Sequence, residues 1–520
     1  MTPATEATLQ TVQTAGAAQT IQSVDWVAIA PPVIAAVVAL VVLVADLFLD
    51  NRRKPLLGWI SLAGLALAGL SLIPLIGENR STFCLTGGSG GSGGSGACSY
   101  VADPFALVIQ FLALGGAFVA ALLSVTSVKD DKLPEGEFWF LLLSSAAGAA
   151  LLPASRDLAT LVVALEVASL PAFALVGLRR GERRSSEAAL KFFLSSVTAT
   201  AVMLMGVSFV YAATGSMHLD AVAEGLPATD SRLGTLATTG VALTLVGFAF
   251  KTAAVPFHFW VPDTYVGAPL PVAAYLSVVG KAVGFSGLIL VTLRAFPSYD
   301  HVWGPALAVL AALTMTVGNL GALRQRPDRE HSAVRLLAWS SVGQAGYLLV
   351  PIAAAAWTDD RDRAVGATVA YALMYGVVNL GAFAVAALVG RTSAANRIGN
   401  YRGLVSSRPL AALCLGFFLL CLAGLPPGVV GLFAKVTVFG AAVDAGLGWL
   451  AVVMAVNVVI ALYYYLQWTA VLFRTDGRED VPRVAPSGVL TATIAVTAVL
   501  GVAISGAPQL ILRFADTALF

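Results

Sequence analysis

GVALTLVGFAFKTAAVPFHFWVPD, residues 240–263, is an apolar run in which Lys251 stands five residues before Pro256. A second run, FFLLCLAGLPPGVVGLFAKVTVF at residues 417–439, carries a Pro-Pro pair shortly before Lys435. Proline breaks or kinks a helix because it lacks a backbone N–H. In membrane transporters, broken helices at matching positions of two halves indicate inverted repeats, with ion sites near the middle of the bilayer. The two runs therefore predict a membrane fold containing two inverted repeats.

The composition supports a membrane protein. Of the 520 residues, 58% are hydrophobic and 12% are charged, whereas soluble domains carry roughly 25% charged residues. We expect an all-α polytopic protein whose environment is the lipid bilayer. The formal net charge of +2 is too small to indicate a nucleic-acid partner.

Windows of about 20 apolar residues predict the membrane-spanning helices. They give about 14 spans, and the proline-interrupted ones are the seventh and twelfth. The predicted ranges are 25–49, 56–76, 104–126, 137–153, 158–178, 187–213, 236–256, 270–295, 302–323, 332–356, 364–389, 409–440, 449–473 and 486–506.

The basic residues predict the orientation of these spans. Alternate loops on one side hold 20 lysines and arginines, and the loops on the other side hold 7. Cytoplasmic loops are enriched in lysine and arginine. We therefore expect both termini on the non-cytoplasmic side.

The predicted spans divide the chain into five regions. Residues 1–24 are polar and lack a basic start, so we expect an external tail rather than a cleaved signal. The other regions are helices one to three at 25–126 with a Gly/Ser-rich external loop at 77–103, a first five-helix repeat at 137–295, a second, inverted repeat at 302–473, and a C-terminal helix within 486–520.

The external loop contains CLTGGSGGSGGSGAC, residues 84–98. Its glycine-serine repeat is typical of a flexible spacer, and it lacks the Gly-Lys-Ser/Thr ending of a phosphate-binding loop. On this oxidising side, two states of Cys84 and Cys98 are compatible with the sequence: a disulfide or two free thiols. The other two cysteines, Cys414 and Cys421, show no metal-ligand pattern and are interpreted as packing residues.

Ionisable residues inside apolar spans are the candidate site. Three of the seven lysines, Lys251, Lys281 and Lys435, and the carboxylate of Glu166 lie well within predicted helices. In a bilayer, lysine can lose its proton whereas arginine cannot, and a nearby carboxylate favours the charged lysine. We expect Glu166 to approach Lys251 as a switch, and the three lysines to pass protons laterally.

Other polar residues have two interpretations. Glu187 and Lys191 are spaced for a helix-surface ion pair near an interface, which favours a supporting role. His258 lies on the Lys251 face if the helix continues past Pro256, where it is either a proton relay or a buried, satisfied histidine. Several polar residues could line a proton path, although ordinary interhelical hydrogen bonding is the simpler explanation for each: Asn319, Ser340, Ser341, Gln344, Tyr371, Tyr375, Asn379 and Asn457.

Five segments together resemble a known family. They are LVVALEVASLPAFALVGL, EAALKFFL, FAFKTAAVPFHFWVPDTYVGAPLPVAAYLSVVGKAVGF, RLLAWSSVGQAGYLL and LAGLPPGVVGLFAKVTVF. The chain resembles the antiporter-like membrane subunits of NADH:quinone oxidoreductase, respiratory complex I, over roughly residues 100–475. The wording VPDTYVGAPLPV is closest to the N-type subunits.

The resemblance implies fourteen helices, two inverted five-helix repeats and a place in a proton-translocating arm of a bacterial inner membrane. It implies that Glu166 and Lys251 are the glutamate and lysine of helices five and seven, that Lys281 is a central relay, and that Lys435 is the lysine of helix twelve. Glu187, Lys191 and His258 fall on polar positions familiar in this family. Gln344 departs from it, since histidine is common there and glutamine cannot titrate.

The chain lacks signatures of redox chemistry. It has no cysteine cluster for iron-sulfur centres, no dinucleotide fingerprint and no haem motif. The resemblance implies that NADH, FMN, iron-sulfur clusters and quinone bind to partner subunits, and that the partners include further antiporter-like subunits. Two alternatives remain open: a subunit of a multi-subunit cation/proton antiporter, and a non-transporting scaffold.

Overall fold

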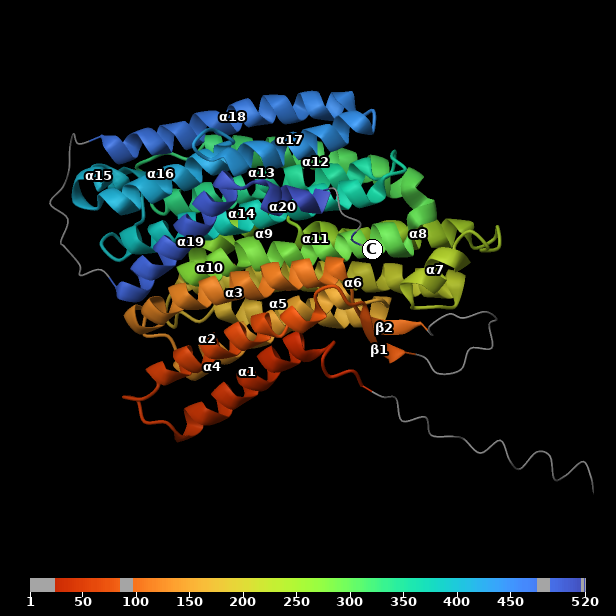
Figure 1. Ribbon diagram of the computed structural model, residues 1–520, viewed down its shortest axis with the longest axis horizontal. Coiled ribbons are helices and arrows are strands. Elements are labelled where there is room, and N and C mark those ends of the chain that lie inside the picture. Colours follow the sequence, from red (N-terminus) through yellow and green to blue (C-terminus); the bar gives the residue numbers. More distant parts are fainter. Residues whose placement is uncertain (1–23, 85–96, 475–486, 516–518, 520) are drawn as a thin grey trace, which may run out of the picture.

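The apolar runs fold as long helices that lie side by side (Figure 1). The computed structural model describes residues 24–84, 97–474, 487–515 and 519. Most of the expected tail at 1–24 and the glycine-serine segment at 85–96 lie outside these residues. In the described part, 13 helices are long and apolar enough to cross a membrane, so the expected polytopic helical fold is confirmed.

The N-terminal half contains the first strands and helices. Figure 1 shows α1 and α2 at one edge of the molecule. The elements are α1 (Ala30–Phe48), α2 (Pro55–Leu70), β1 (Arg80–Cys84), β2 (Cys98–Ala102), α3 (Pro104–Asp130), α4 (Glu135–Leu151), α5 (Leu158–Val176), α6 (Arg183–Thr214), α7 (Leu219–Gly225), α8 (Gly234–Lys251), α9 (Trp260–Gly267), α10 (Leu270–Tyr275) and α11 (Lys281–Ile289). Two π-helical segments, Leu276–Gly280 and Leu290–Ala295, follow α10 and α11. Together these four elements form one membrane span.

The C-terminal half extends the bundle to the opposite edge, where α18 lies (Figure 1). Its helices are α12 (Asp300–Leu323), α13 (Ser332–Ala354), α14 (Arg361–Gly390), α15 (Leu404–Ser407), α16 (Pro409–Ala423), α17 (Val429–Asp444), α18 (Gly448–Phe473), α19 (Gly488–Gly506) and α20 (Gln509–Leu512). The α19 helix then returns to the middle of the bundle and packs against α14 and α3. The C-terminal part thus joins the two halves.

The two spans expected to be interrupted by proline each contain a break in the structure. The helix predicted at 236–256 ends at Lys251, and the chain is not helical again until Trp260. The range 409–440 is likewise two helices rather than one, because α16 ends at Ala423 and α17 begins at Val429. Prolines lie in both interruptions, where they cannot donate the next helical hydrogen bond.

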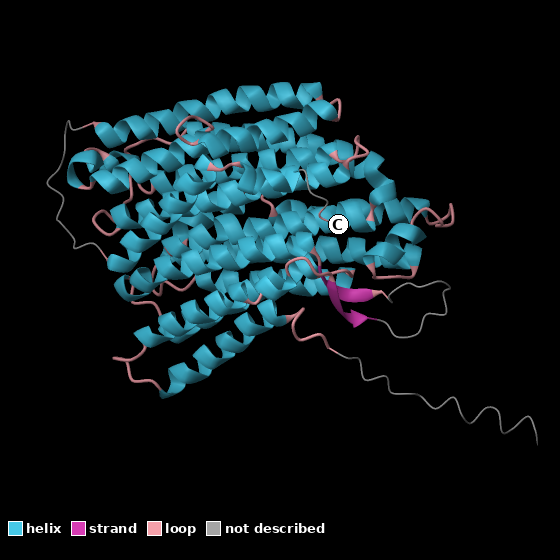
Figure 2. Cartoon of the chain, viewed as in Figure 1, coloured by secondary structure: helices cyan, strands magenta, loops and turns pink. Residues whose placement is uncertain are grey.

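A β-hairpin, which the sequence did not predict, forms in the external loop. Figure 2 shows its two strands as the β-structure of the described residues. The strands pair antiparallel with Cys84 opposite Cys98, and a disulfide joins these cysteines. Their sequences, RSTFC and CSYVA, contain the threonine, valine and aromatic residues that favour strands. Residues flanking a glycine-rich spacer can therefore still pair.

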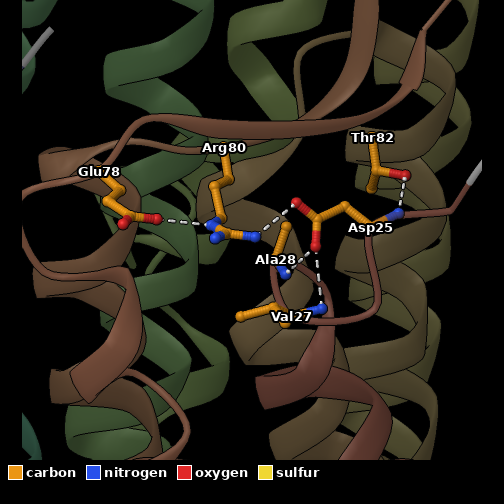
Figure 3. Close-up of polar contacts among 6 residues, drawn as sticks. All are labelled: Asp25, Val27, Ala28, Glu78, Arg80 and Thr82. Atoms are coloured by element: carbon orange, nitrogen blue, oxygen red, sulfur yellow. Dashed lines mark hydrogen bonds and ion pairs between the residues drawn. The ribbon is translucent and has the colours of Figure 1, made fainter.

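The hairpin is joined to the start of α1 by the polar cluster shown in Figure 3. Arg80 lies between Glu78 and Asp25, at nitrogen–oxygen distances of 2.7 Å and 3.2 Å. Asp25 Oδ1 also accepts from the N–H groups of Val27 and Ala28 at 3.0 Å and 3.1 Å. Although desolvation raises the pKa of Asp25, these donors and Arg80 outweigh it and lower the pKa.

Candidate functional site

Lys251 is buried at the end of α8. Its side chain is 5% exposed, and its Nζ donates a hydrogen bond to Ser169 Oγ on α5. The Ser169 hydroxyl in turn donates to the Leu165 carbonyl in its own helix. The ammonium therefore lies beside a hydroxyl that can pass a hydrogen bond onward, at the point where α8 stops.

Lys281 is buried in the next membrane span along the chain, Leu270–Ala295. It is 3% exposed and is the first residue of α11, directly after a π-helical segment. Its Nζ donates to the backbone carbonyl of Ser341 on α13. Tyr375 on α14 donates to the Ser341 hydroxyl at 2.8 Å, so polar atoms of two other helices surround this lysine.

Lys435 on α17 binds the end of a neighbouring helix. It is 3% exposed, and its Nζ donates to the carbonyls of Leu422 and Ala423 at 2.9 Å and 2.7 Å. These are the last carbonyls of α16, which lack intrahelical partners because the helix stops there. A cation at a helix C-terminus is also stabilised by the helix dipole. The interruption between α16 and α17 thus creates the site that Lys435 occupies.

Polar side chains on α13 connect the surroundings of Lys281 and Lys435. Gln344 lies one turn after Ser341, and its Nε2 donates to the Leu422 carbonyl at 3.5 Å and to the Tyr465 hydroxyl at 3.2 Å. Tyr371 donates to Gln344 Oε1, and Tyr465 shares a hydrogen bond with Ser340. Gln344 and Lys435 therefore share one acceptor.

Most of the other polar residues considered for the path form bonds between helices. Asn319 donates to Asn457 at 3.1 Å and accepts from Tyr464 at 2.9 Å. Asn379 donates to Ser277 at 2.7 Å. These contacts are compatible with either a proton path or ordinary packing of polar groups.

Glu166 does not pair with Lys251 in this structure. Its Oε1 accepts a hydrogen bond from Thr200 on α6 at 2.7 Å, and its side chain is partly exposed on the outer face of α5 rather than fully enclosed. The lysine instead binds Ser169, three residues along the same helix. The expected approach of Glu166 to Lys251 therefore stays a prediction about another state.

The supporting residues lie at the rim of a cavity. Lys191 Nζ is 2.8 Å from Glu187 and 3.0 Å from Asp263 on α9, and Arg335 on α13 lies 3.6 Å from the same aspartate. The lysine and glutamate side chains are each about half exposed. All four residues line a cavity of about 430 Å³ on the arginine-rich side.

A larger cavity of about 890 Å³ adjoins the first. The two share lining residues that include Arg184, Glu330 and His331. Arg184 lies 3.0 Å from Glu330. Burial, together with nearby arginines such as Arg184, lowers the pKa of His331. Charges of both signs therefore surround the openings on this side.

His258 does not continue the face of Lys251. It lies in the non-helical segment between α8 and α9, and its ring is 5.5 Å from that of Trp339. The condition for the shared face, a helix continuing past Pro256, is not met because the helix ends at Lys251. The helical alignment that depended on this condition therefore does not occur, and a supporting role for His258 stays a prediction.

Sequence reasoning missed the direct partners of the lysines. Ser169, the Ser341 carbonyl and the Leu422 carbonyl are contributed by other helices, and backbone carbonyls leave no signal in a sequence. Asp263 could have been found, because it is an acidic residue in the quoted run. Among the described residues, no group of three histidines, cysteines or carboxylates could hold a metal ion.

Comparisons with known proteins agree on one family. Residues 155–461 match the family described as NADH:quinone oxidoreductase/Mrp antiporter, transmembrane. The chain is 69% identical over 515 residues to NADH-quinone oxidoreductase subunit N 2 of Streptomyces griseus, covering 96% of this chain and 95% of that relative. It is 44% identical to NADH-quinone oxidoreductase subunit N of Salinispora tropica, covering 89% and 88%.

Solved structures have the same architecture. A chain of respiratory complex I from Thermus thermophilus with bound Aureothin superposes with a TM-score of 0.73 at 33% identity, covering 93% of this chain and 98% of that one. A chain of the Mrp complex from Dietzia sp. DQ12-45-1b gives a TM-score of 0.79 at 22% identity, covering 94% and 96%. The second likeness concerns the fold alone.

Proposed function

The chain belongs to the NADH:quinone oxidoreductase/Mrp antiporter transmembrane family and is a membrane-arm subunit of complex I, and we propose that its buried lysines carry protons. The observation that supports this most is the burial of three lysines that form no direct ion pair with a carboxylate of the described residues. Lys251, Lys281 and Lys435 are each at most 5% exposed. A buried charge without a direct ion pair is costly, and lysine suits such a position for proton transfer because it can release its proton, whereas arginine cannot.

The partners of each lysine suit reversible proton binding. Ser169 and the carbonyls of Ser341, Leu422 and Ala423 accept hydrogen bonds from the ammonium but carry no negative charge. A hydroxyl can also donate to a neutral amine, whereas a carbonyl cannot. Each site can therefore bind a proton reversibly. A salt bridge would hold the proton on the lysine more tightly.

Glu166 would regulate the first lysine. In the structure its carboxylate accepts a hydrogen bond from Thr200 and forms no direct ion pair with Lys251. Rotation or helix movement that brings the carboxylate toward the lysine would favour the ammonium, and its return would favour proton release. We also propose that 137–295 and 302–473 are inverted repeats, since each contains an interrupted helix with a buried lysine beside the interruption.

The energy for transport would come from elsewhere in the assembly. We infer that this subunit acts as a translocase without a redox centre of its own, and that NADH, FMN, iron-sulfur clusters and quinone are bound by partner subunits. Both termini would lie outside the cytoplasm, in the bacterial inner membrane, following the distribution of basic residues.

The central test replaces Lys281 by methionine in the assembled complex. Methionine keeps most of the side-chain volume but cannot bind a proton, so we expect assembly to persist and NADH-driven proton uptake into proteoliposomes to fall severalfold. Lys129→Met, at an exposed position on α3, is the matched control and should leave pumping unchanged. Glu166→Ala should assemble and pump less.

The same preparation separates the two alternatives. Unchanged protons per NADH in Lys281→Met and Lys251→Ala would favour a scaffold. Sodium-for-proton exchange without NADH would favour a cation/proton antiporter. Pumping that requires NADH and quinone and is independent of sodium is the expected result.

A further inference from the structure

An aromatic layer lies between the charged cavity and Lys251. The cavity of about 430 Å³ is lined by Lys191 and Asp263. Phe192, the next residue after Lys191, is fully buried, with its ring centroid 5.9 Å from Lys251 Nζ. One side of this layer is therefore charged and open, and the other holds the buried lysine.

Two rings form the centre of the layer. Phe192 on α6 and Trp260 on α9 stack with centroids 4.3 Å apart and planes 12° from parallel. Phe173 on α5 packs its ring edge against Phe192 at 4.6 Å. The indole N–H of Trp260 donates to the Phe250 carbonyl at 3.3 Å, so the polar atom of the layer is already bonded.

Such a layer interrupts proton transfer. Protons move along continuous chains of hydrogen-bonding groups and water, and an apolar constriction excludes water by dewetting. The stacked rings offer no free donor or acceptor between the ion pairs at Lys191 and the ammonium of Lys251. In the described structure the two rings are in stacking contact.

Trp260 belongs to a short helix, α9, whose two ends make different contacts. Trp260 is the first residue of α9, which has only eight residues and follows the non-helical segment after Lys251. The other end of α9 is held against α6, because Gly267 approaches Ala188 so closely that a Cβ atom would lie 2.4 Å from the alanine Cβ. Asp263 adds its ion pair with Lys191. The tryptophan end contacts α6 through the ring stack and α8 through one hydrogen bond.

We propose that Phe192 and Trp260 form a gate that controls access of water and protons from the cavity to Lys251. The gate opens when the start of α9 moves away from α6 and separates the rings. Both residues are positioning residues, since they act on the hydration of Lys251 rather than on the proton itself. The inference rests on the proposed function, because a gate matters only if Lys251 exchanges protons with the cavity.

The test measures passive proton leak through the complete complex. Proteoliposomes containing a pH-sensitive dye receive an acid jump in the absence of NADH, and the rate of internal acidification is recorded. Phe192→Ala removes the ring between cavity and lysine, so we expect a severalfold faster leak and fewer protons pumped per NADH. Phe193→Ala, on the adjacent and more exposed position, should match the wild type.

Further variants distinguish a gate from a packing defect. Trp260→Phe preserves an aromatic stack and should restrict the leak to near the wild-type rate, whereas Trp260→Ala should leak. Phe192→Leu retains apolar volume and folding but loses the flat ring, and we expect an intermediate leak. Adding Lys251→Met to Phe192→Ala should abolish the extra leak.

Two results would overturn the gate. One is a wild-type leak rate in Phe192→Leu and Trp260→Ala complexes that retain NADH oxidation. The other is an equal leak in Phe193→Ala. If Lys251→Ala still lowers pumping in either case, the proposed function survives without the gate.

Discussion

Individual side chains set the character of the path between Lys281 and Lys435. Gln344 lies one turn from Ser341 and bonds Tyr371, Tyr465 and the Leu422 carbonyl. An amide cannot gain or lose a proton near neutral pH. Transfer past this residue therefore depends on hydroxyl groups and water that Gln344 orients.

Gln344→Leu tests this role. It leaves the buried Tyr371 hydroxyl without its acceptor, which costs about 1–3 kcal/mol, and it frees the carbonyl shared with Lys435. We expect a lower thermal unfolding temperature of the complex and slower coupled turnover. Gln467→Leu, on the exposed face of α18, is the control; equal pumping by the two variants would contradict an orienting role for Gln344.

At the scale of elements, the interruption between α16 and α17 positions Lys435. Gly424 caps α16 with φ +84°, in the left-handed region that favours glycine. A Cβ atom there would lie 3.1 Å from Cδ and 3.4 Å from Nζ of Lys435. The glycine therefore provides both the turn and the space for the lysine.

Gly424→Ala and Gly446→Ala separate these two effects. Both glycines have positive φ, so each alanine costs about 1–2 kcal/mol of backbone strain. A Cβ atom at Gly446, with φ +72°, meets no atom within 4 Å. We expect similar losses of thermal stability but a fall in protons pumped per NADH in Gly424→Ala alone. A parallel fall in both variants would show that strain, and not the displaced lysine, is responsible.

At the scale of the whole molecule, one buried ion pair joins distant segments on the hairpin side. Arg156 is 4% exposed and pairs with Asp103, the residue that caps α3. Its backbone N–H donates to the Ser99 carbonyl of β2 at 2.8 Å, and its own carbonyl accepts from Leu219 of α7 at 2.9 Å. One residue thus links the hairpin with two helices.

Arg156→Met should destabilise the molecule strongly. Removing one partner leaves the Asp103 carboxylate buried without its cation, which costs about 3–5 kcal/mol. Arg80→Met removes the partly exposed pair shown in Figure 3 and should cost about 0–1 kcal/mol. Thermal unfolding of the purified complex measures both effects. Equal decreases in the unfolding temperature of the two variants would mean that the Arg156–Asp103 pair is exposed to water.

The sequence predicts much of the element-level architecture because membrane helices are determined locally. Apolar length located the spans, and prolines marked the sites near Lys251 and Lys435 where helical structure stops. It did not predict the hairpin, because pairing of β1 with β2 joins residues on either side of a glycine-rich spacer. The sequence also did not predict that α8 ends at Lys251. Because it ends there, His258 does not lie on the helix face of Lys251.

By itself, the sequence determined the membrane class, the approximate spans, and which ionisable residues lie inside them, because hydropathy and helix breakers act over short stretches of chain. Only the tertiary structure decided the partners: Ser169 for Lys251, the Ser341 carbonyl for Lys281, and the end of α16 for Lys435. It also turned Glu166 toward Thr200. These choices depend on which helices pack together, since in a low-dielectric interior a polar group must bond to whatever its neighbours present.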